Sequence, residues 1–225
     1  MKVVALTAGD GDTSSTSPPR RVLGVVLAGG QSRRMGRDKA GVVVDGETMG
    51  DRACALVAGV TDAVVVSGHG RGIDARWLRL PDRHHEYGPV GGIAAALAHL
   101  DGLGDADPAW RGASLLVVPV DMPWLDAALL CRLRDAPATN GDVAGAAALL
   151  AADGRVAPLP LRLGAGQTGV VDAALAAGQR SLLGVIVRLG ATLVPLDSAD
   201  AHKLGNLNDG AALGLAAPAP SSLVA

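Results

Sequence analysis

The chain carries the string LGVVLAGGQSRRMGRDK at residues 23–39. The string begins with an apolar, β-branched run, which predicts a buried strand over Val22–Leu27. The run ends at Gly29 and Gly30, where the backbone can adopt positive φ and approach a ligand closely. Three arginines and a lysine follow up to Lys39. A buried strand that leads into a glycine turn edged with cations is typical of a polyphosphate-binding loop. The alternative is an ordinary strand-to-helix turn whose basic edge faces solvent.

Two familiar phosphate-binding motifs are absent from this stretch of sequence. The glycines are not followed by Gly-Lys-Ser/Thr, which excludes a Walker P-loop. The spacing Gly-x-Gly-x-x-Gly of dinucleotide-binding proteins is missing as well. A different kind of nucleotide-binding loop is therefore indicated.

The complete pattern LAGGxSxRMGxDK, at residues 27–39, resembles the signature loop of molybdenum cofactor guanylyltransferases. The resemblance implies a three-layer, Rossmann-like α/β nucleotidyltransferase fold with a mostly parallel central sheet. It also implies transfer of GMP from GTP to molybdopterin, with Mg²⁺ as the cofactor. Further similar segments are Asp121–Leu125, the turn Gly88–Gly92, Arg155–Leu161, Gly178–Leu182 and Asn206–Asp209, so the resemblance covers about Val22 to Leu213.

Composition favours a sheet that is buried on both faces. Hydrophobic residues make up 49% of the 225 residues and aromatic residues only 2%, and mean hydropathy is +0.31. The core must therefore consist of Val, Leu, Ile and Ala, which suits a parallel sheet covered by helices on both sides. The two cysteines, Cys54 and Cys131, are expected to be reduced core residues.

Charge and hydropathy also exclude several classes of partner. The net charge of −2 gives no electrostatic footprint for nucleic acid. No apolar run approaches the roughly 20 residues that a membrane span needs. We therefore expect no nucleic-acid or membrane partner and a cytoplasmic location. GTP and molybdopterin are the expected substrates, and transient contacts with other molybdenum cofactor proteins are a further hypothesis.

The pattern along the chain predicts one domain between two tails. Residues 1–20 are rich in Gly, Ser, Thr and Pro and predict a disordered tail, residues 21–214 form the nucleotidyltransferase domain, and residues 215–225 form a flexible tail. Strands are expected at Val22–Leu27, Val42–Val44, Ala63–Gly68, Trp77–Leu80, Ser114–Val120, Asp142–Ala148, Ala157–Arg162 and Thr192–Leu196. Helices are expected at Thr48–Gly59, Gly88–Leu100, Leu125–Arg134, Val171–Ala177 and Ser181–Leu189, with a polar loop at Gly102–Arg111 and a last helix after Asp209. This alternation favours a three-layer α/β sheet.

Three of the expected strands end in residues suited to a nucleotide. The glycine loop follows Leu27, Asp82 comes after Leu80, and Asp121 directly follows Val120. Because ligands of open α/β sheets bind beyond the carboxyl ends of the strands, these residues should meet at one edge. A carboxylate beside a triphosphate suits Mg²⁺. The alternative for Asp121 is that it caps the helix expected at Leu125–Arg134.

The resemblance implies a role for each matching residue. Lys39 and Arg34 would neutralise phosphate charge and act as catalytic residues with Asp121, while the amides of Ala28, Gly29 and Gly30 would hold phosphates. The nucleotide-binding residues would be Leu27, Ala28, Gly29, Gly30, Arg33, Lys39, Ser67, Asp82, Gly88 and Asp121. Asp121 and Asn208 would hold the metal, and Asp82 would lie on the nucleoside side.

Two alternatives to this activity stay open. Ser67-Gly68-His69 stands where some members of the family carry an Asn-rich strand end, so the base could be guanine or cytosine. A related enzyme could use CTP with molybdopterin, or another nucleotide with a sugar phosphate. The chain could also be a non-catalytic nucleotide-binding protein that retains the fold.

Overall fold

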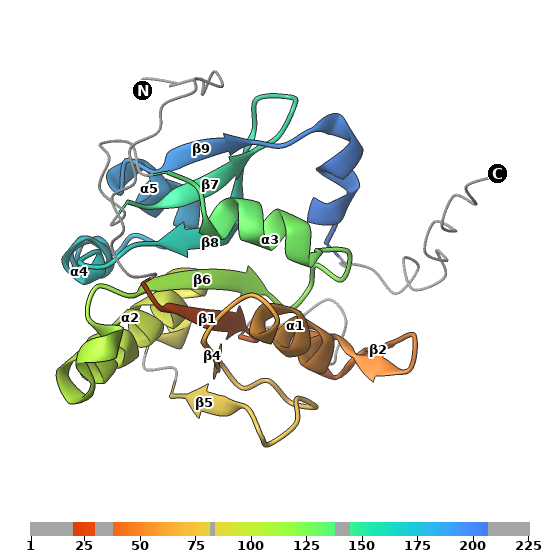
Figure 1. Ribbon diagram of the computed structural model, residues 1–225, viewed down its shortest axis with the longest axis horizontal. Coiled ribbons are helices and arrows are strands. Elements are labelled where there is room, and N and C mark those ends of the chain that lie inside the picture. Colours follow the sequence, from red (N-terminus) through yellow and green to blue (C-terminus); the bar gives the residue numbers. More distant parts are fainter. Residues whose placement is uncertain (1–19, 30–37, 82–83, 138–144, 207–225) are drawn as a thin grey trace.

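The computed structural model describes residues 20–29, 38–81, 84–137 and 145–206 (Figure 1). Its strands are β1 (Val22–Leu27), β2 (Val43–Val44), β3 (Glu47–Thr48), β4 (Ala63–Ser67), β5 (Leu78–Leu80), β6 (Ser114–Pro119), β7 (Ala147–Leu150), β8 (Val156–Leu163) and β9 (Thr192–Pro195). The α-helices are α1 (Met49–Ala58), α2 (Pro89–Ala106), α3 (Ala127–Arg134), α4 (Thr168–Ala176) and α5 (Leu182–Arg188). The 3-10 helices are η1 (Lys39–Gly41), η2 (His85–Tyr87), η3 (Pro108–Trp110) and η4 (Ser198–Leu204).

A mixed sheet of seven strands forms the middle layer, in the order β5-β4-β1-β6-β8-β7-β9. Strands β5, β4, β1 and β6 run parallel, β8 is antiparallel to both of its neighbours, and β9 is parallel to β7. Leu27 lies in register with Ser67 on one side and Pro119 on the other, so three strands end level. The chain order reverses between β1 and β6, which is the place where open α/β sheets bind their ligands.

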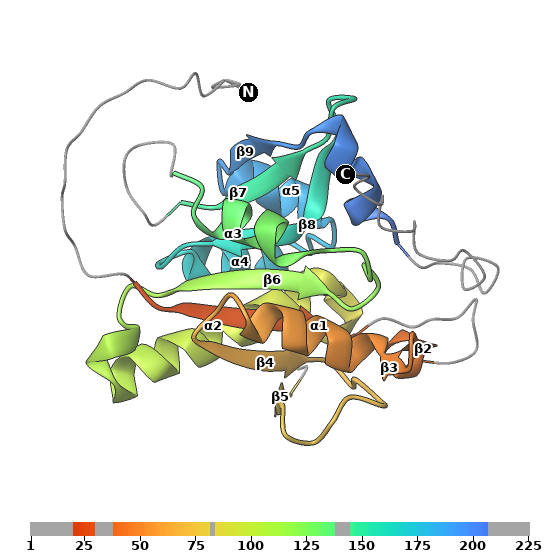
Figure 2. The same cartoon turned by 45° about the vertical axis from the view of Figure 1, so that its right-hand side comes forward.

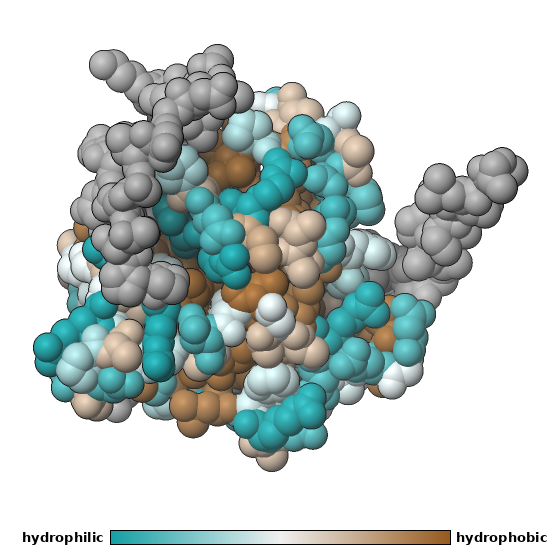
Figure 3. All heavy atoms as spheres, in the orientation of Figure 1, coloured by the Kyte–Doolittle hydropathy of each residue, from teal (hydrophilic) through white to brown (hydrophobic). Residues whose placement is uncertain are grey.

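Helices cover both faces of this sheet, which confirms the predicted three-layer α/β fold. Helices α1 and α3 lie on one face, and α2, α4 and α5 lie on the other (Figures 1 and 2). Side chains of β1 alternate between the two cores, with Leu23 and Val25 in one and Val22 and Val26 in the other. This alternation follows from the two-residue period of a strand. On the face drawn in Figure 3, apolar residues reach the surface between groups of hydrophilic residues.

Close packing of α1 against β1 explains a glycine inside the first strand. A Cβ at Gly24 would overlap Val57 Cγ1 and lie 2.8 Å from Thr61 Oγ1. The absence of a side chain at this position therefore lets α1 approach the sheet.

The structure corrects some predicted boundaries. Helix α2 continues to Ala106 rather than ending at Leu100, so it takes in the first part of the loop expected at Gly102–Arg111. Leu103 packs against the core there, and this contact outweighs the poor helix propensity of the two glycines in the segment. Strand β7 extends to Leu150, beyond the expected end at Ala148, because Leu149 is fully buried. The last predicted helix lies outside the described residues.

In the part of the chain that the structure describes, no helix combines the length and the apolar composition needed to cross a membrane.

Candidate active site

A lysine and an aspartate from distant parts of the chain meet at the reversal point of the sheet. The ammonium nitrogen Nζ of Lys39 lies 2.9 Å from Oδ2 of Asp121. The two side chains are 18% and 23% exposed, so the pair is largely shielded but open to a ligand. Lys39 opens η1, beyond the end of β1, and Asp121 follows β6. Two of the three predicted catalytic residues are therefore in contact.

Hydrogen bonds of Asp38 fix the backbone around Lys39. Oδ1 of Asp38 accepts a bond from the amide of Ala40 at 3.0 Å and thereby caps η1. Oδ2 accepts a bond from the amide of Arg71 at 2.9 Å, in the loop between β4 and β5. The two loops are in close contact, since a Cβ at Gly72 would lie 2.6 Å from Cα of Gly41. Lys39 thus projects from a turn whose backbone is fixed by these contacts.

Asp121 lies at a strand end rather than at a helix cap. The amide of Val120 donates to the carbonyl of Leu27 at 3.2 Å, which holds the end of β6 against β1. Helix α3 is capped by Asp126, whose Oδ1 accepts a bond from the amide of Leu129 at 2.8 Å. The alternative interpretation of Asp121 as the N-cap is therefore wrong. The helix begins at Ala127, two residues later than predicted, because the turn at 122–125 comes first.

The end of β1 is joined to the end of β4. The amide of Ala28 donates to the carbonyl of Ser67 at 2.8 Å, so this amide is engaged within the sheet rather than held out to a phosphate as expected. Gly68 has a φ of +104°, and a Cβ there would lie 2.5 Å from the amide nitrogen of Gly29. Only glycine fits this close approach. A phosphate-binding turn at this strand end would consequently start at Gly29.

In the predicted turn at the start of α2, Gly91 and Gly92 are closely packed, whereas Gly88 lies at the surface. A Cβ at Gly92 would lie 2.8 Å from Oγ of Ser67, and one at Gly91 would overlap the carbonyl oxygen of His84. These two glycines let α2 pack closely, and the Ser67 side chain beneath is only 2% exposed. Gly88 is exposed, with a φ of +58°. It is the N-cap residue of α2, where amide groups and the helix dipole favour an anion.

The structure brings one more cation to the start of α2. The guanidinium carbon of Arg180, in the turn between α4 and α5, lies 5.8 Å from the centre of the Tyr87 ring. Tyr87 directly precedes Gly88. The sequence contained a signal for this residue, because Gly178–Leu182 resembles a segment of the family, but nothing in the pattern placed Arg180 beside Tyr87.

Cys54 does not have the character of a nucleophile. Both cysteines are free, and Cys54 is fully buried in the core. Burial, with a smaller contribution from Asp51, raises the pKa of the Cys54 thiol to about 12. The thiolate form that reacts is therefore negligible near neutral pH.

Several predicted site residues lie outside the described part of the chain. They are Gly30, Arg33, Arg34, Asp82 and Asn208. Their roles stay predictions, as does the domain boundary at residue 214. Within the described ranges, no group of three or more His, Cys, Asp or Glu side chains could hold a metal by itself. Asp121 offers one carboxylate, which fits a hard cation that takes its other ligands from phosphate and water.

A mostly parallel sheet with a cation and a carboxylate at its reversal point defines a Rossmann-like nucleotide-binding protein. Comparison with known proteins gives the class more closely. A family model described as the MobA-like NTP transferase domain matches residues 24–192. The chain belongs to this family.

Relatives and solved structures agree with this assignment. A molybdenum cofactor guanylyltransferase of Rhodobacter capsulatus is 35% identical over 198 residues, covering 84% of this chain and 90% of that protein. Alignments with several other relatives of that name cover 52% to 61% of their length, so the chain spans little more than half of those proteins. Molybdopterin-guanine dinucleotide biosynthesis protein A of Archaeoglobus fulgidus has the same fold, with a TM-score of 0.64, 22% identity and coverage of 85% of this chain and 94% of that one. A Mycobacterium tuberculosis protein solved in complex with manganese has a TM-score of 0.53, 18% identity and coverage of 80% and 90%.

Proposed function

We propose that this chain transfers GMP from GTP to molybdopterin and releases pyrophosphate. The observation that carries the proposal is the contact between Lys39 and Asp121 at the reversal point of the sheet. The Rhodobacter relative, which aligns over most of its length, bears the name of this activity. Together they favour guanylyl transfer over the other activities of nucleotidyltransferases.

The reaction is an in-line displacement at phosphorus. An oxygen of the acceptor's terminal phosphate attacks the α-phosphorus of GTP, and the bond from that phosphorus to the bridging oxygen breaks. The electron pair leaves with pyrophosphate. Such a transfer depends on positioning and on neutralisation of charge, and it needs no covalent intermediate on the protein.

Lys39 would bind the phosphate oxygens through its positive charge, and Asp121 would bind the metal ion through its negative charge. Each of these two side chains offsets the charge of the other at 2.9 Å. When a triphosphate enters, the ammonium group of Lys39 can donate to its oxygens, and Arg34 would add a second cation as the resemblance implies. The carboxylate of Asp121 is then available to a divalent cation.

We propose Mg²⁺ as that cation, held by Asp121 and, as the resemblance implies, by Asn208. Bound there, the ion would neutralise phosphate charge and orient the triphosphate. The donor set of a single described carboxylate suits Mg²⁺, which usually binds through one or two carboxylates together with substrate phosphates. The manganese complex of the mycobacterial protein, which has the same fold, is consistent with divalent metal use. A cytoplasmic location and contacts with other molybdenum cofactor proteins stay predictions.

A nucleotide panel tests which substrate the site selects. Thermal melting of the protein is measured with GTP, CTP, ATP and UTP, each with Mg²⁺. A nucleotide at a hundredfold excess over Kd should stabilise the native state by about 2.7 kcal/mol, and we expect the largest shift with GTP. A larger shift with CTP would replace guanylyl by cytidylyl transfer. Binding of GTP without pyrophosphate release in the presence of molybdopterin would indicate a non-catalytic protein.

A further inference from the structure

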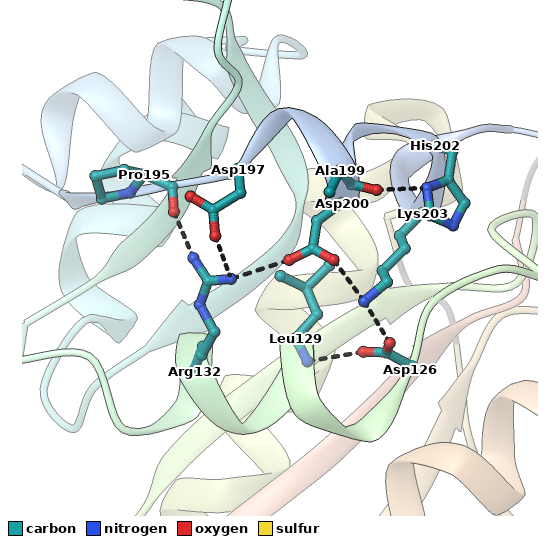
Figure 4. A network of polar contacts seen from close by, with 9 residues as sticks. All are labelled: Asp126, Leu129, Arg132, Pro195, Asp197, Ala199, Asp200, His202 and Lys203. Atoms are coloured by element: carbon teal, nitrogen blue, oxygen red, sulfur yellow. Dashed lines mark hydrogen bonds and ion pairs between the residues drawn. The ribbon is translucent and has the colours of Figure 1, made fainter. Parts of the chain in front are cut away.

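A chain of alternating charges fastens η4 to helix α3 (Figure 4). Nη1 of Arg132 lies 3.1 Å from Oδ2 of Asp200, and Oδ1 of Asp200 lies 2.6 Å from Nζ of Lys203. Nζ of Lys203 also lies 2.5 Å from Oδ2 of Asp126. At the other end of this row of ion pairs, Arg132 donates to the carbonyl of Pro195 at 2.7 Å. Charges of opposite sign therefore follow one another from β9 to the N-terminus of α3.

Lys203 is the member of this charge network that contacts the N-cap residue of α3, Asp126. Its side chain is only 18% exposed. The carboxylate of Asp126 is fully used, because Oδ1 caps α3 through the amide of Leu129 while Oδ2 binds Lys203. Burial alone would raise the pKa of Asp126, but the bonds from Lys203 and Leu129 lower it below its ordinary value. Asp126 is thus held ionised in contact with Lys203.

Apolar contacts join the same two segments. Leu204 packs against the same core cluster as Met122 and Trp124. A Cβ at Gly205 would lie 2.9 Å from Cζ3 of Trp124. The segment that follows Lys203 therefore lies directly on the loop between β6 and α3, and Asp121 is the second residue of this loop.

We propose that Lys203 is a positioning residue for the nucleotide and metal site, acting through Asp126 and the loop on Asp121. The loop is short and contains Pro123, and its two ends are fixed by the bond of Val120 to Leu27 and by the contact of Asp126 with Lys203. If the second attachment is lost, the loop can move and carry Asp121 away from Lys39. A displacement of about 1 Å in a positioned reacting group can cost on the order of 10²-fold in rate. The effects on metal binding, nucleotide binding and rate rest on the proposed function, whereas the effect on amide exchange in the loop does not.

The alternative is that this contact only stabilises the C-terminal segment, and three variants separate the two roles. Lys203→Met removes the charge and keeps most of the apolar stem. Lys203→Arg keeps the charge and should restore function. Asp135→Asn is the matched control, because Asp135 forms an ion pair of 2.7 Å with Arg134 at the opposite end of α3. Gly205→Ala is a further variant, which disturbs the contact with Trp124 without changing any charge.

The experiment measures Mn²⁺ binding by electron paramagnetic resonance in the presence of GTP, amide hydrogen exchange over residues 121–130, and the rate of GMP transfer. For Lys203→Met we expect faster exchange in this segment and a Mn²⁺ concentration at half-saturation raised by about tenfold, with a rate loss on the order of tenfold to a hundredfold. Lys203→Arg should stay close to the wild type, Asp135→Asn should leave all three measurements unchanged, and Gly205→Ala should change them in the direction of Lys203→Met. If Lys203→Met does not fold, the three measurements on Gly205→Ala decide between a positioning role and a purely structural role.

Two outcomes would overturn the inference. Faster exchange in Lys203→Met with Mn²⁺ binding and rate unchanged would show that the contact is only structural. Unchanged exchange would show that Lys203 does not hold the loop. The proposed function fails separately, if the wild type binds Mn²⁺ and GTP and makes no product.

Discussion

Replacing Asp121 with Asn separates the proposed catalytic role of this carboxylate from any structural role. The substitution keeps the shape of the side chain and one acceptor oxygen for Lys39, but it removes the negative charge. Because Asp126 is the residue that caps α3, no helix cap is lost. We therefore expect the fold to survive and the reaction to fail.

The structure sets the size of each effect. The pair with Lys39 spans 2.9 Å, and its side chains are 18% and 23% exposed, so it is neither fully buried nor free in solvent. Pairs open to solvent are worth about 0.2–1 kcal/mol, and the loss in the free energy of unfolding should stay near the upper end of that range. For a domain of this size, 1 kcal/mol corresponds to a melting shift of about 2–4 °C. Loss of a preorganised electrostatic contact with the reacting groups costs about 10²–10³-fold in rate.

The assay combines thermal melting without nucleotide with single-turnover GMP transfer over a Mg²⁺ titration. Asp121→Asn should melt within a few degrees of the wild type, react about 10²–10³-fold more slowly and need more Mg²⁺ for half-maximal rate. Asp135→Asn loses another ion-paired carboxylate and should retain the full rate. Wild-type turnover of Asp121→Asn at low Mg²⁺ would refute the reasoning.

Four other perturbations follow from the contacts described above. Lys39→Ala should weaken GTP binding in a calorimetric titration with little change in melting temperature, and unchanged turnover would remove Lys39 from the site. Asp126→Ala loses both the cap of α3 and the ion pair with Lys203 and should lower the free energy of unfolding in urea by at least about 1 kcal/mol, whereas a neutral result would contradict the capping assignment. Gly24→Ala should destabilise by about 1–3 kcal/mol through overlap with Val57, and Val57→Ala in the same chain should recover part of this loss; a destabilisation unaffected by Val57→Ala would point to another cause. Because the pKa of Asp126 is lowered in the folded state, its charge stabilises the fold above its ordinary pKa near 3.8, and this contribution is lost as the pH falls through the folded pKa. The difference in melting temperature between the wild type and Asp126→Asn should therefore shrink from pH 5 to pH 3. A constant difference would contradict this linkage.

The parallel half of the fold could be predicted from the sequence because its strands are continuous apolar runs with clear ends. The runs at Val22–Leu27 and Ser114–Val120 stop before Gly29 and at Asp121, and the structure places both of these stops at one edge of the sheet. Since parallel strands present their carboxyl ends together, placement of the residues after Val22–Leu27 and of Asp121 at one edge could be expected from the sequence, whereas the ion pair of Lys39 with Asp121 could not.

Other features depend on tertiary contacts that local patterns do not encode. The sequence left Asp121 as a possible cap of α3, but the turn at 122–125 delays the helix and makes Asp126 the cap. The antiparallel placement of β8 beside β6 has no local signal, because strand periodicity is the same in either direction. Lys203 lies in a polar segment without periodicity, so its contact with Asp126 could be found only from the structure.

The central claim, transfer of GMP to molybdopterin, is tested most directly by following the α- and γ-phosphorus atoms of GTP through the reaction. The protein is incubated with Mg²⁺, molybdopterin and GTP labelled either at the α- or at the γ-phosphorus. Guanylyl transfer predicts that the α-label appears in a molybdopterin–guanine dinucleotide, while an equal amount of γ-label appears in pyrophosphate. If GTP binds and the α-label never reaches the acceptor, or if labelled CTP gives product faster than GTP, the proposed function is contradicted.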